Sequence, residues 1–257
     1  MSKDLPIGFF DSGIGGLSML AAVMKRLPYE RFVYFGDSAH APYGTKSEQE
    51  VRELTMSAVQ FLTKRGIKAL VVACNTATSA GIGALRDRYD FPVIGIEPAL
   101  KLAHDTRKEG LILVLATPLT VASEKYHSLF EQYGEHAITL PSPGLMDFVE
   151  REEMNSPALQ QYLSDLFEPY KDQSIDAVVL GCTHYLFLKD AIASCLPKYT
   201  RLLDSNDGVA RQLIRKLTEQ NLLSDAKDAG YVDIISTGKA EKERQLHRIL
   251  KVAQSLF

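Results

Sequence analysis

Short apolar runs alternate with longer amphipathic stretches along this chain. Most of the runs are continuously apolar rather than alternating, which is typical of strands buried on both faces of a parallel sheet. The amphipathic stretches Glu48–Arg65 and Ser156–Pro169 are expected to be helices, the second opened by a Ser-Pro start signal. Apolar runs that alternate with amphipathic stretches at this spacing predict an α/β fold. The expected strands are Ile7–Phe10, Phe32–Phe35, Ala69–Ala73, Val93–Ile96, Leu111–Leu115, Ala137–Leu140, Ala177–Leu180, Arg201–Leu203 and Val232–Ile235.

The composition is that of an ordinary globular protein. The 257 residues are 46% hydrophobic and 24% charged, with a net charge of −3, which suits one large domain or two small ones. No basic surplus points to nucleic acid or to an anionic membrane. No apolar stretch approaches the roughly 20 residues of a membrane span, and the N-terminal run is too short for a signal peptide. We therefore expect a cytoplasmic protein with reduced thiols.

The chain has three cysteines, Cys74, Cys182 and Cys195, which is no disulfide framework. The stretch Leu70–Thr76 resembles Val178–His184, because each has a buried-strand pattern followed by a cysteine and a polar residue. This internal echo predicts two similar α/β lobes. Each lobe would place a cysteine beyond the carboxyl end of a strand, where open α/β sheets bind ligands.

Two interpretations of these cysteines remain open on the residues alone. A strand-end cysteine that precedes a helix lies near exposed N–H groups and a positive helix end, which favour the reactive thiolate. Alternatively, free cysteines are small buried hydrophobes; Cys195, without polar company, is predicted to be structural. His184 is placed to tune Cys182. Cys74, Cys182 and His184 lack the paired spacing of zinc ligands, so we predict no metal site.

Asp11 opens a glycine-rich turn before a predicted helix. The glycines permit a tight turn and close approach of a ligand, and the helix start offers N–H groups to a carboxylate or phosphate. A dinucleotide loop is the rival interpretation, since Gly13, Gly15 and Asp37 loosely follow that fingerprint, but Ser18 replaces its third glycine. A plain helix N-cap by Asp11 or Ser12 is the other alternative.

Three further segments carry polar groups next to predicted strands or helices. Pro42–Thr45 is a turn-rich loop that either closes over a site or connects elements. Thr117 and Thr120 offer hydroxyls to a ligand or cap a helix. Glu150 ends an apolar helical run, where a solvated helix end is the alternative. Lys101 and Lys125 follow strand ends, but no phosphate-binding context accompanies them, so no feature demands a pyridoxal phosphate cofactor.

Together these motifs resemble the glutamate racemase family. They follow the family's order and spread from residue 7 to about 210. The sequence departs from the family pattern at Leu186, where proline is usual, at Asp147, where proline is common, and at Lys239, where aspartate is frequent. The matching stretches are Asp11–Leu17, Tyr34–Asp37, Pro42–Gly44, Ala73–Ala77, Gly95–Pro98 and Leu180–Tyr185.

The resemblance implies two pseudo-symmetric α/β lobes with mainly parallel sheets and the active site in the cleft between them. The lobes are expected at residues 1–97 with 208–257, and at 98–207. Cys74 and Cys182 are the implied acid/base pair, Asp11 assists Cys74, and His184 and Glu150 assist Cys182. The implied substrate contacts are Asp11, Ser12, Pro42, Tyr43, Gly44, Asn75, Thr76, Thr117, Thr120, Thr183 and His184.

The implied activity is a cofactor-independent interconversion of L- and D-glutamate that supplies D-glutamate for peptidoglycan. A homodimer, a small-molecule substrate and no nucleic-acid or membrane partner are further expectations. The alternatives are a racemase for aspartate or another amino acid, a non-catalytic amino-acid-binding protein, and a thiol-dependent hydrolase with a single nucleophile.

Overall fold

Two parallel sheets, one of five strands and one of four, are the framework of this computed structural model, which describes residues 2–257. They lie in two compact units, Met1–Ile96 with Asn206–Phe257 and Glu97–Ser205. Every strand pairing is parallel. The strands are β1 (Ile7–Asp11), β2 (Phe32–Gly36), β3 (Ala69–Val72), β4 (Val93–Gly95), β5 (Leu111–Ala116), β6 (Ala137–Pro141), β7 (Ile175–Leu180), β8 (Arg201–Leu203) and β9 (Val232–Ser236).

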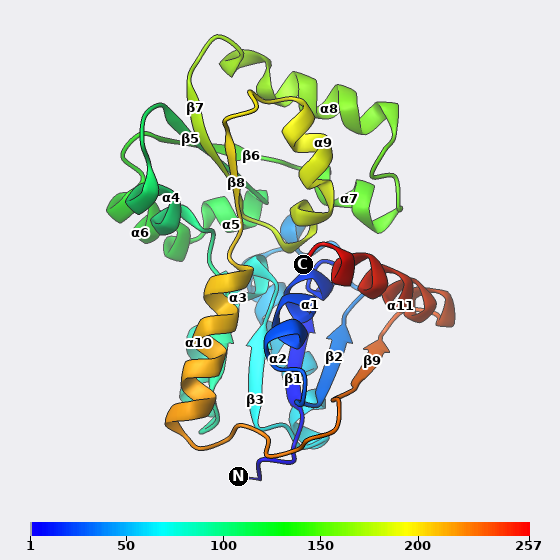
Figure 1. Cartoon of the computed structure of the whole chain (residues 1–257). Helices are drawn as coiled ribbons and strands as arrows, with labels where there is room; N and C mark the ends of the chain where they lie inside the picture. The colour runs from blue at the N-terminus through cyan, green and yellow to red at the C-terminus, as the bar shows by residue number, and fades with distance from the viewer. Residues whose placement is uncertain (1) are drawn as a thin grey trace. The chain divides into compact units, whose positions relative to one another are not determined.

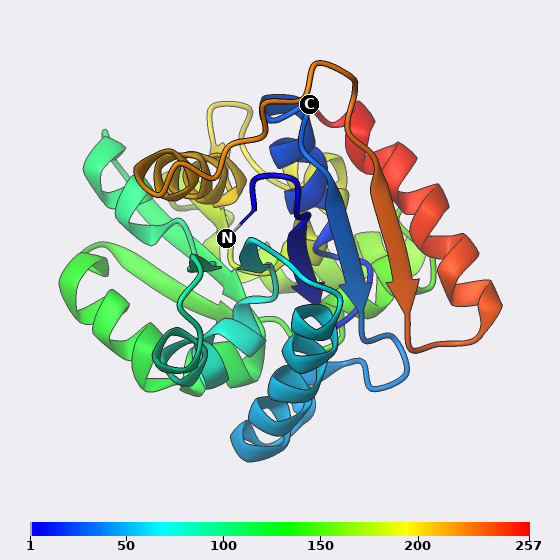
Figure 2. The ribbon, with the colours of Figure 1, turned by 90° about the horizontal axis from the view of Figure 1, so that it is seen from below.

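The first unit is a five-stranded sheet in the order β4-β3-β1-β2-β9 with helices on both faces. Figures 1 and 2 show α1, α10 and α11 on one face and α2 on the other, where α3 packs against α2. The inner strands β1, β2 and β3 are buried along their whole length. The C-terminal segment returns to this sheet, since β9 pairs with β2. The helices are α1 (Leu17–Arg26), α2 (Glu48–Lys64), α3 (Asn75–Arg88), α10 (Asn206–Glu219) and α11 (Ala240–Ser255), with a 3₁₀ helix at Tyr43–Thr45.

The second unit is a four-stranded sheet in the order β6-β5-β7-β8. On one face, α4 and α6 pack against β5 and β7 around Leu100, Ile112, Tyr126 and Val179, while α7, α8 and α9 form a second group of helices (Figure 1). The helices are α4 (Leu100–Thr106), α5 (Pro118–Ala122), α6 (Glu124–Tyr133), α7 (Leu145–Glu150), α8 (Pro157–Phe167) and α9 (Lys189–Ser194), with 3₁₀ helices at Glu168–Tyr170 and Thr183–Leu188.

The two sheets share one strand order. The order β8-β7-β5-β6 in the second unit corresponds to β4-β3-β1-β2 in the first, with β9 as an addition to the first. The predicted α/β fold of two similar parallel lobes is confirmed. The reason is visible in the sequence, because strands covered by helices on both faces need apolar side chains on both faces.

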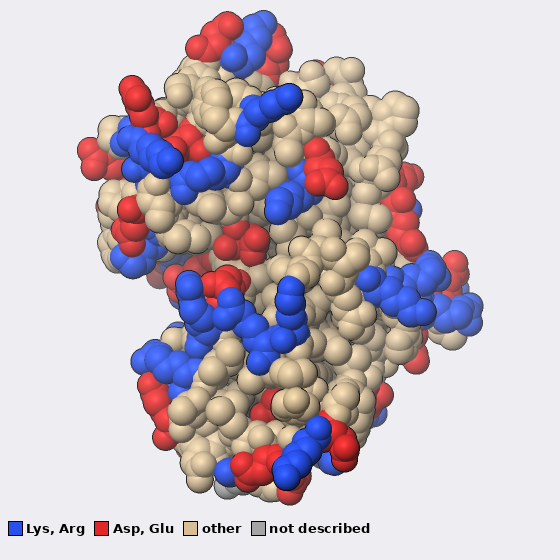
Figure 3. Space-filling view, viewed as in Figure 1, with Lys and Arg blue, Asp and Glu red and all other residues tan. Residues whose placement is uncertain are grey.

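Charged side chains of both signs are spread over the surface of the protein. On the face shown in Figure 3, Lys and Arg side chains are interspersed with Asp and Glu, as expected for a net charge of −3. No helix within residues 2–257 has the length and apolar composition to cross a bilayer.

Candidate active site

Cys74 lies two residues beyond the end of β3 and is the N-cap of α3. Its side chain is buried, with 6% of the residue exposed. Its Sγ accepts a hydrogen bond from the backbone N–H of Ala77, at 3.4 Å, and lies 3.6 Å from the Ser12 hydroxyl. The first N–H groups of a helix have no partner within the helix and carry its positive partial charge. The sulfur therefore occupies a position that favours the thiolate.

Asp11 is the last residue of β1, the strand next to β3 in the sheet. The carboxylate is fully buried and its Oδ1 accepts from the backbone N–H of Gly13 at 2.9 Å. The Tyr34 hydroxyl holds the same turn by donating to the Gly13 carbonyl at 2.8 Å. A Cβ on Gly16 would lie 2.6 Å from the Asp11 Cβ, so only glycine lets the chain pass this close.

The interpretation of Asp11 or Ser12 as the N-cap of the following helix is wrong. Helix α1 begins after Gly16, and no side chain caps it. The turn that the glycines make possible spans Asp11 to Gly16, so the helix starts too late for either side chain to cap it. The polar side chains of the turn therefore contact groups other than the helix: the Ser12 hydroxyl, for example, contacts the Cys74 sulfur.

Tyr43 and Gly44 are buried in the 3₁₀ helix that follows Pro42. The Tyr43 hydroxyl donates to Asp37 Oδ2 at 2.6 Å, and Asp37 Oδ1 also accepts from the Thr237 hydroxyl at 2.6 Å. Burial raises the pKa of Tyr43 far above its ordinary value, and the hydrogen bond and charge of Asp37 raise it further, with smaller contributions from Cys74 and Asp11. Tyr43 is therefore a neutral phenol at every working pH.

Asp37 had a role only in the rival dinucleotide-loop interpretation and none in the predicted racemase site. Asp37 comes directly after β2, and Asp11 is the last residue of β1. An acidic residue at the end of two neighbouring strands was the sequence signal that could have identified Asp37. The carboxylate is buried and pairs with His40 Nδ1 at 2.8 Å besides Tyr43 and Thr237. Asp37 thus fixes the loop that carries Tyr43.

Cys182 follows β7 as Cys74 follows β3, but its surroundings differ. Cys182 is 9% exposed and precedes a 3₁₀ helix rather than an α-helix, and no side-chain cap forms there. Its Sγ lies 3.7 Å from His184 Nδ1, and His184 Nε2 lies 3.0 Å from Glu150 Oε1. The three side chains form a chain of contacts from thiol to imidazole to carboxylate.

The protonation of His184 follows from these two contacts. Its complete burial lowers the pKa of the imidazole, but hydrogen bonds and charge interactions with Cys182 and Glu150 outweigh burial and hold the pKa well above its usual value. Glu150 closes α7, which packs against the 3₁₀ helix of His184, and its side chain is 13% exposed. The alternative of a solvated helix end does not describe Glu150.

The remaining predicted contacts divide between the units. Asn75 and Thr76 are the first residues of α3, next to Cys74, and both are buried. Thr183 Oγ1 lies 3.5 Å from His184 Nδ1. Thr117 caps α5 by accepting from the N–H of Thr120 and also donates to the Thr120 hydroxyl at 2.9 Å, so the capping interpretation describes its geometry. Polar side chains therefore follow each cysteine directly along the chain, while Thr117 and Thr120 contact each other at the start of α5.

Two kinds of side chain bear on a cofactor: metal ligands and lysines able to form a Schiff base. Among residues 2–257, no group of three His, Cys, Asp or Glu side chains is arranged to hold a metal ion. Lys101 is mostly exposed and Lys125 pairs with Glu97. Lys68 is fully buried, but it pairs with Glu30 just before β3 begins, at the opposite end of that strand from Cys74.

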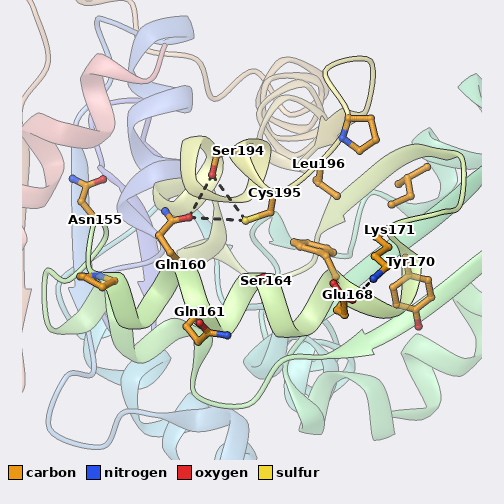
Figure 4. A pocket seen from close by; sticks show the side chains of 14 residues that line it. Asn155, Gln160, Gln161, Ser164, Glu168, Tyr170, Lys171, Ser194, Cys195 and Leu196 are labelled. Atoms are coloured by element: carbon orange, nitrogen blue, oxygen red, sulfur yellow. Dashed lines mark hydrogen bonds and ion pairs between the residues drawn. The ribbon is translucent and has the colours of Figure 1, made fainter.

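A groove of about 770 Å³ runs between α8 and α9 in the second unit (Figure 4). Cys195 lines it, half-buried, with its sulfur 4.0 Å from the Gln160 amide oxygen. The apolar part of the groove's wall is formed by Phe167, Ile175 and Leu196. None of the predicted site residues lines this groove, so it is separate from the groups around Cys74 and Cys182.

Comparison with known proteins gives concordant matches. Residues 17–213 match the family described as Asp/Glu/Hydantoin racemase. A curated glutamate racemase of Clostridium perfringens strain 13 is 45% identical over 251 residues, covering 96% of each chain. The glutamate racemase of Thermus thermophilus, solved with β-chloro-D-alanine, is 37% identical with a TM-score of 0.84 over 97% of this chain and 94% of that one. The Escherichia coli glutamate racemase, solved with L-glutamate and the activator UDP-MurNAc-Ala, is 31% identical with a TM-score of 0.85 over 97% and 95%.

Proposed function

We propose that this chain, which belongs to the Asp/Glu/hydantoin racemase family, interconverts L- and D-glutamate by a two-thiol proton transfer. One observation carries the proposal: two buried thiols follow equivalent strands, β3 and β7, of two sheets with the same order. Substrate identity is supported by the 45% identity with a glutamate racemase and by the E. coli relative's complex with L-glutamate. Aspartate is the nearest alternative, since one methylene changes affinity by only about 1–3 kcal/mol.

In the proposed reaction, Cys74 and Cys182 approach opposite faces of the substrate Cα. One cysteine, as thiolate, takes the Cα proton; the Cα–H bond breaks, an S–H bond forms, and the electron pair stays on the substrate. The other cysteine, as thiol, gives its proton to the opposite face. The two roles exchange for the reverse direction, so each cysteine serves as both acid and base.

The two thiolates are stabilised differently in this proposal. For Cys74, the Ala77 N–H and the start of α3 supply positive partial charge, and Asp11 accepts or returns a proton on the neighbouring strand. For Cys182, the His184 imidazolium supplies a full positive charge and Glu150 holds that imidazolium in place. An ion pair and a helix terminus are two recognised means of activating a cysteine.

The developing carbanion and the substrate carboxylates need fixed donors, because no electron-sink cofactor takes part in this mechanism. Backbone N–H groups at the start of α3 and the hydroxyls of Ser12, Thr76 and Thr183 are the proposed donors. Tyr43 contributes a neutral phenol held by Asp37. Pro42, Gly44, Asn75, Thr117 and Thr120 complete the proposed lining, which excludes water and so strengthens each of these interactions.

The cellular role we propose is the supply of D-glutamate for peptidoglycan in a bacterial cytoplasm, by an enzyme that forms homodimers. We also propose that residues 1–97 with 208–257, and residues 98–207, are its two domains. The compact units Met1–Ile96 with Asn206–Phe257 and Glu97–Ser205 support this division.

The test is exchange of the Cα proton in D₂O without added cofactor. Proton NMR follows loss of the Cα–H signal of L-glutamate and, separately, of L-aspartate, while polarimetry follows loss of rotation. Fast exchange with racemisation of glutamate, strongly impaired in both Cys74→Ser and Cys182→Ser, supports the proposal. A preference for aspartate changes the substrate and keeps the mechanism. No exchange with either amino acid overturns the assignment, and grossly unequal defects in the two variants favour a single-nucleophile hydrolase.

A further inference from the structure

Thr78, on the first turn of α3, is a buried residue that the mechanism leaves without a role. It is 1% exposed and lies four residues after Cys74. Its backbone N–H donates to the Cys74 carbonyl at 2.9 Å, which closes the first α-helical hydrogen bond of α3. Thr78 is therefore coupled through the backbone to the residue that carries the thiol.

The Thr78 hydroxyl connects that turn to the sheet. It donates to the Val72 carbonyl, the last residue of β3, at 3.1 Å. It also accepts from the backbone N–H of Ile96, just beyond β4, at 3.2 Å. One hydroxyl thus joins the ends of two neighbouring strands to the start of α3, and the chain segment between Val72 and Thr78 contains Cys74.

The packing around Thr78 leaves its side chain little freedom. A Cβ on Gly95 would lie 2.7 Å from the Thr78 methyl carbon, so α3 meets β4 here through a glycine. On the other side of the cysteine, the Ala73 N–H donates to the Phe10 carbonyl of β1 at 2.8 Å. The backbone is therefore held both before and after Cys74.

From this arrangement we propose that Thr78 is a positioning residue that fixes the Cys74 thiol against the first N–H groups of α3. The proposal rests on the proposed two-thiol function. The Cys74 sulfur takes its backbone hydrogen bond from Ala77, the residue before Thr78, so movement of this turn changes the donor to the sulfur. At the matching place after Cys182 stands Leu186, which has no hydroxyl, within a 3₁₀ helix. The effect of Thr78 is therefore specific to Cys74.

Thr78→Val tests this, because valine keeps the shape and removes the hydroxyl. The readout is the pH dependence of alkylation by iodoacetamide, followed for the Cys74 and Cys182 peptides separately by mass spectrometry. We expect the midpoint of Cys74 alkylation to rise by about half a pH unit or more as the thiolate loses its fixed donor, while that of Cys182 stays unchanged. Racemisation falls about tenfold or more, equally in both directions in kcat/KM, because the equilibrium constant of a racemisation is one.

Two controls separate positioning from general destabilisation. Thr78→Ser keeps the hydroxyl and restores the wild-type midpoint. Thr55→Val removes a buried hydroxyl for which the described residues offer no hydrogen-bond partner, on the helix that packs against α3, and moves neither midpoint. If Thr78→Val does not fold, Gly95→Ala displaces the Thr78 side chain with its hydroxyl intact and gives the same Cys74-specific shift.

An unchanged Cys74 midpoint in folded Thr78→Val, with only a lower melting temperature, overturns the proposal. Equal shifts at both cysteines overturn it as well. Alkylation reads the thiols without turnover, so a wild-type protein that fails to racemise glutamate refutes the proposed function and leaves this test of Thr78 intact.

Discussion

Cys74 and Cys182 occupy corresponding places in two sheets of the same strand order, yet they have different neighbours. Cys74 is the N-cap of an α-helix and contacts a backbone N–H and a serine hydroxyl. Cys182 immediately precedes a 3₁₀ helix and contacts an imidazole that in turn contacts a carboxylate. The fold thus determines where the two thiols stand, while local residues determine what stabilises them.

This difference has a consequence for pH. The backbone donor beside Cys74 does not titrate, whereas the donor beside Cys182 does. In a two-thiol enzyme built this way, the hydrogen-bond donor to one sulfur keeps its charge at every pH, whereas the donor to the other sulfur is a titrating histidine. Substitutions on the two sides should therefore differ in pH dependence even where they have similar effects on rate.

Removing either sulfur is expected to have the largest effect. Cys74→Ala and Cys182→Ala should each lower racemisation by about 10³-fold or more, because inversion needs a base and an acid on opposite faces. Each variant retains one base, so we expect slow exchange of the Cα proton in D₂O from one enantiomer only, with opposite enantiomers for the two variants. NMR of L- and D-glutamate run separately checks this. Exchange of both enantiomers by one single-thiol variant would show that one thiol reaches both faces.

His184→Gln should have the next largest effect, about 10²-fold on kcat/KM, since it removes the charged partner of Cys182. The loss of thiol reactivity should be confined to Cys182, which lies in the second unit. Alkylation of Cys182 by iodoacetamide at pH 7 should slow, while alkylation of Cys74 in the same sample serves as the internal control. Equal slowing at both cysteines contradicts the separation of the two neighbourhoods.

Glu150→Gln should lower kcat/KM by about tenfold, because it removes the second partner of His184 and leaves the first. The pKa of His184 is raised on folding, so its stabilising contribution is present below its ordinary value of 6.5 and is lost as pH rises through the raised pKa. The variant should therefore be less stable than wild type at pH 6 and nearly equal to it well above the raised pKa. Urea unfolding over a pH series that starts at pH 6 and rises measures how the stability difference between the variant and the wild type closes. A difference that stays the same over the whole series refutes this account.

Lys68→Met should have the smallest effect on catalysis, within about twofold, although it acts on the strand that precedes Cys74. Lys68 pairs with Glu30 at 2.6 Å and both are buried, so methionine leaves an unpaired buried carboxylate that costs about 3–5 kcal/mol of stability. Urea unfolding and kcat measured below the melting transition test the two parts. A large fall in kcat in the folded variant would mean that the two ends of β3 are coupled.

The sequence alone located every strand of the structure and both cysteine turns, because continuous apolar runs and glycine-rich turns are local signals. It did not reveal features that depend on partners far away along the chain. The role of Asp37 depends on Thr237, 200 residues away along the chain. The short 3₁₀ helix after Cys182 packs against α7, a contact that no local pattern in the sequence announces. The alternative of a helix cap at Asp11 or Ser12 arose because Gly16, the N-cap of α1, has no side chain to mark the start of the helix.

The route of the chain through the first sheet affects how the protein is made. The chain leaves this unit at Ile96 and returns at Asn206, and β9 joins the sheet last, beside β2. During synthesis the second unit is complete while the first still has β2 as an unpaired edge. Nascent chains fold in order of emergence, and exposed strand edges invite wrong pairings. The half that carries Cys74 therefore depends for its completion on a segment that leaves the ribosome after the whole of the second unit.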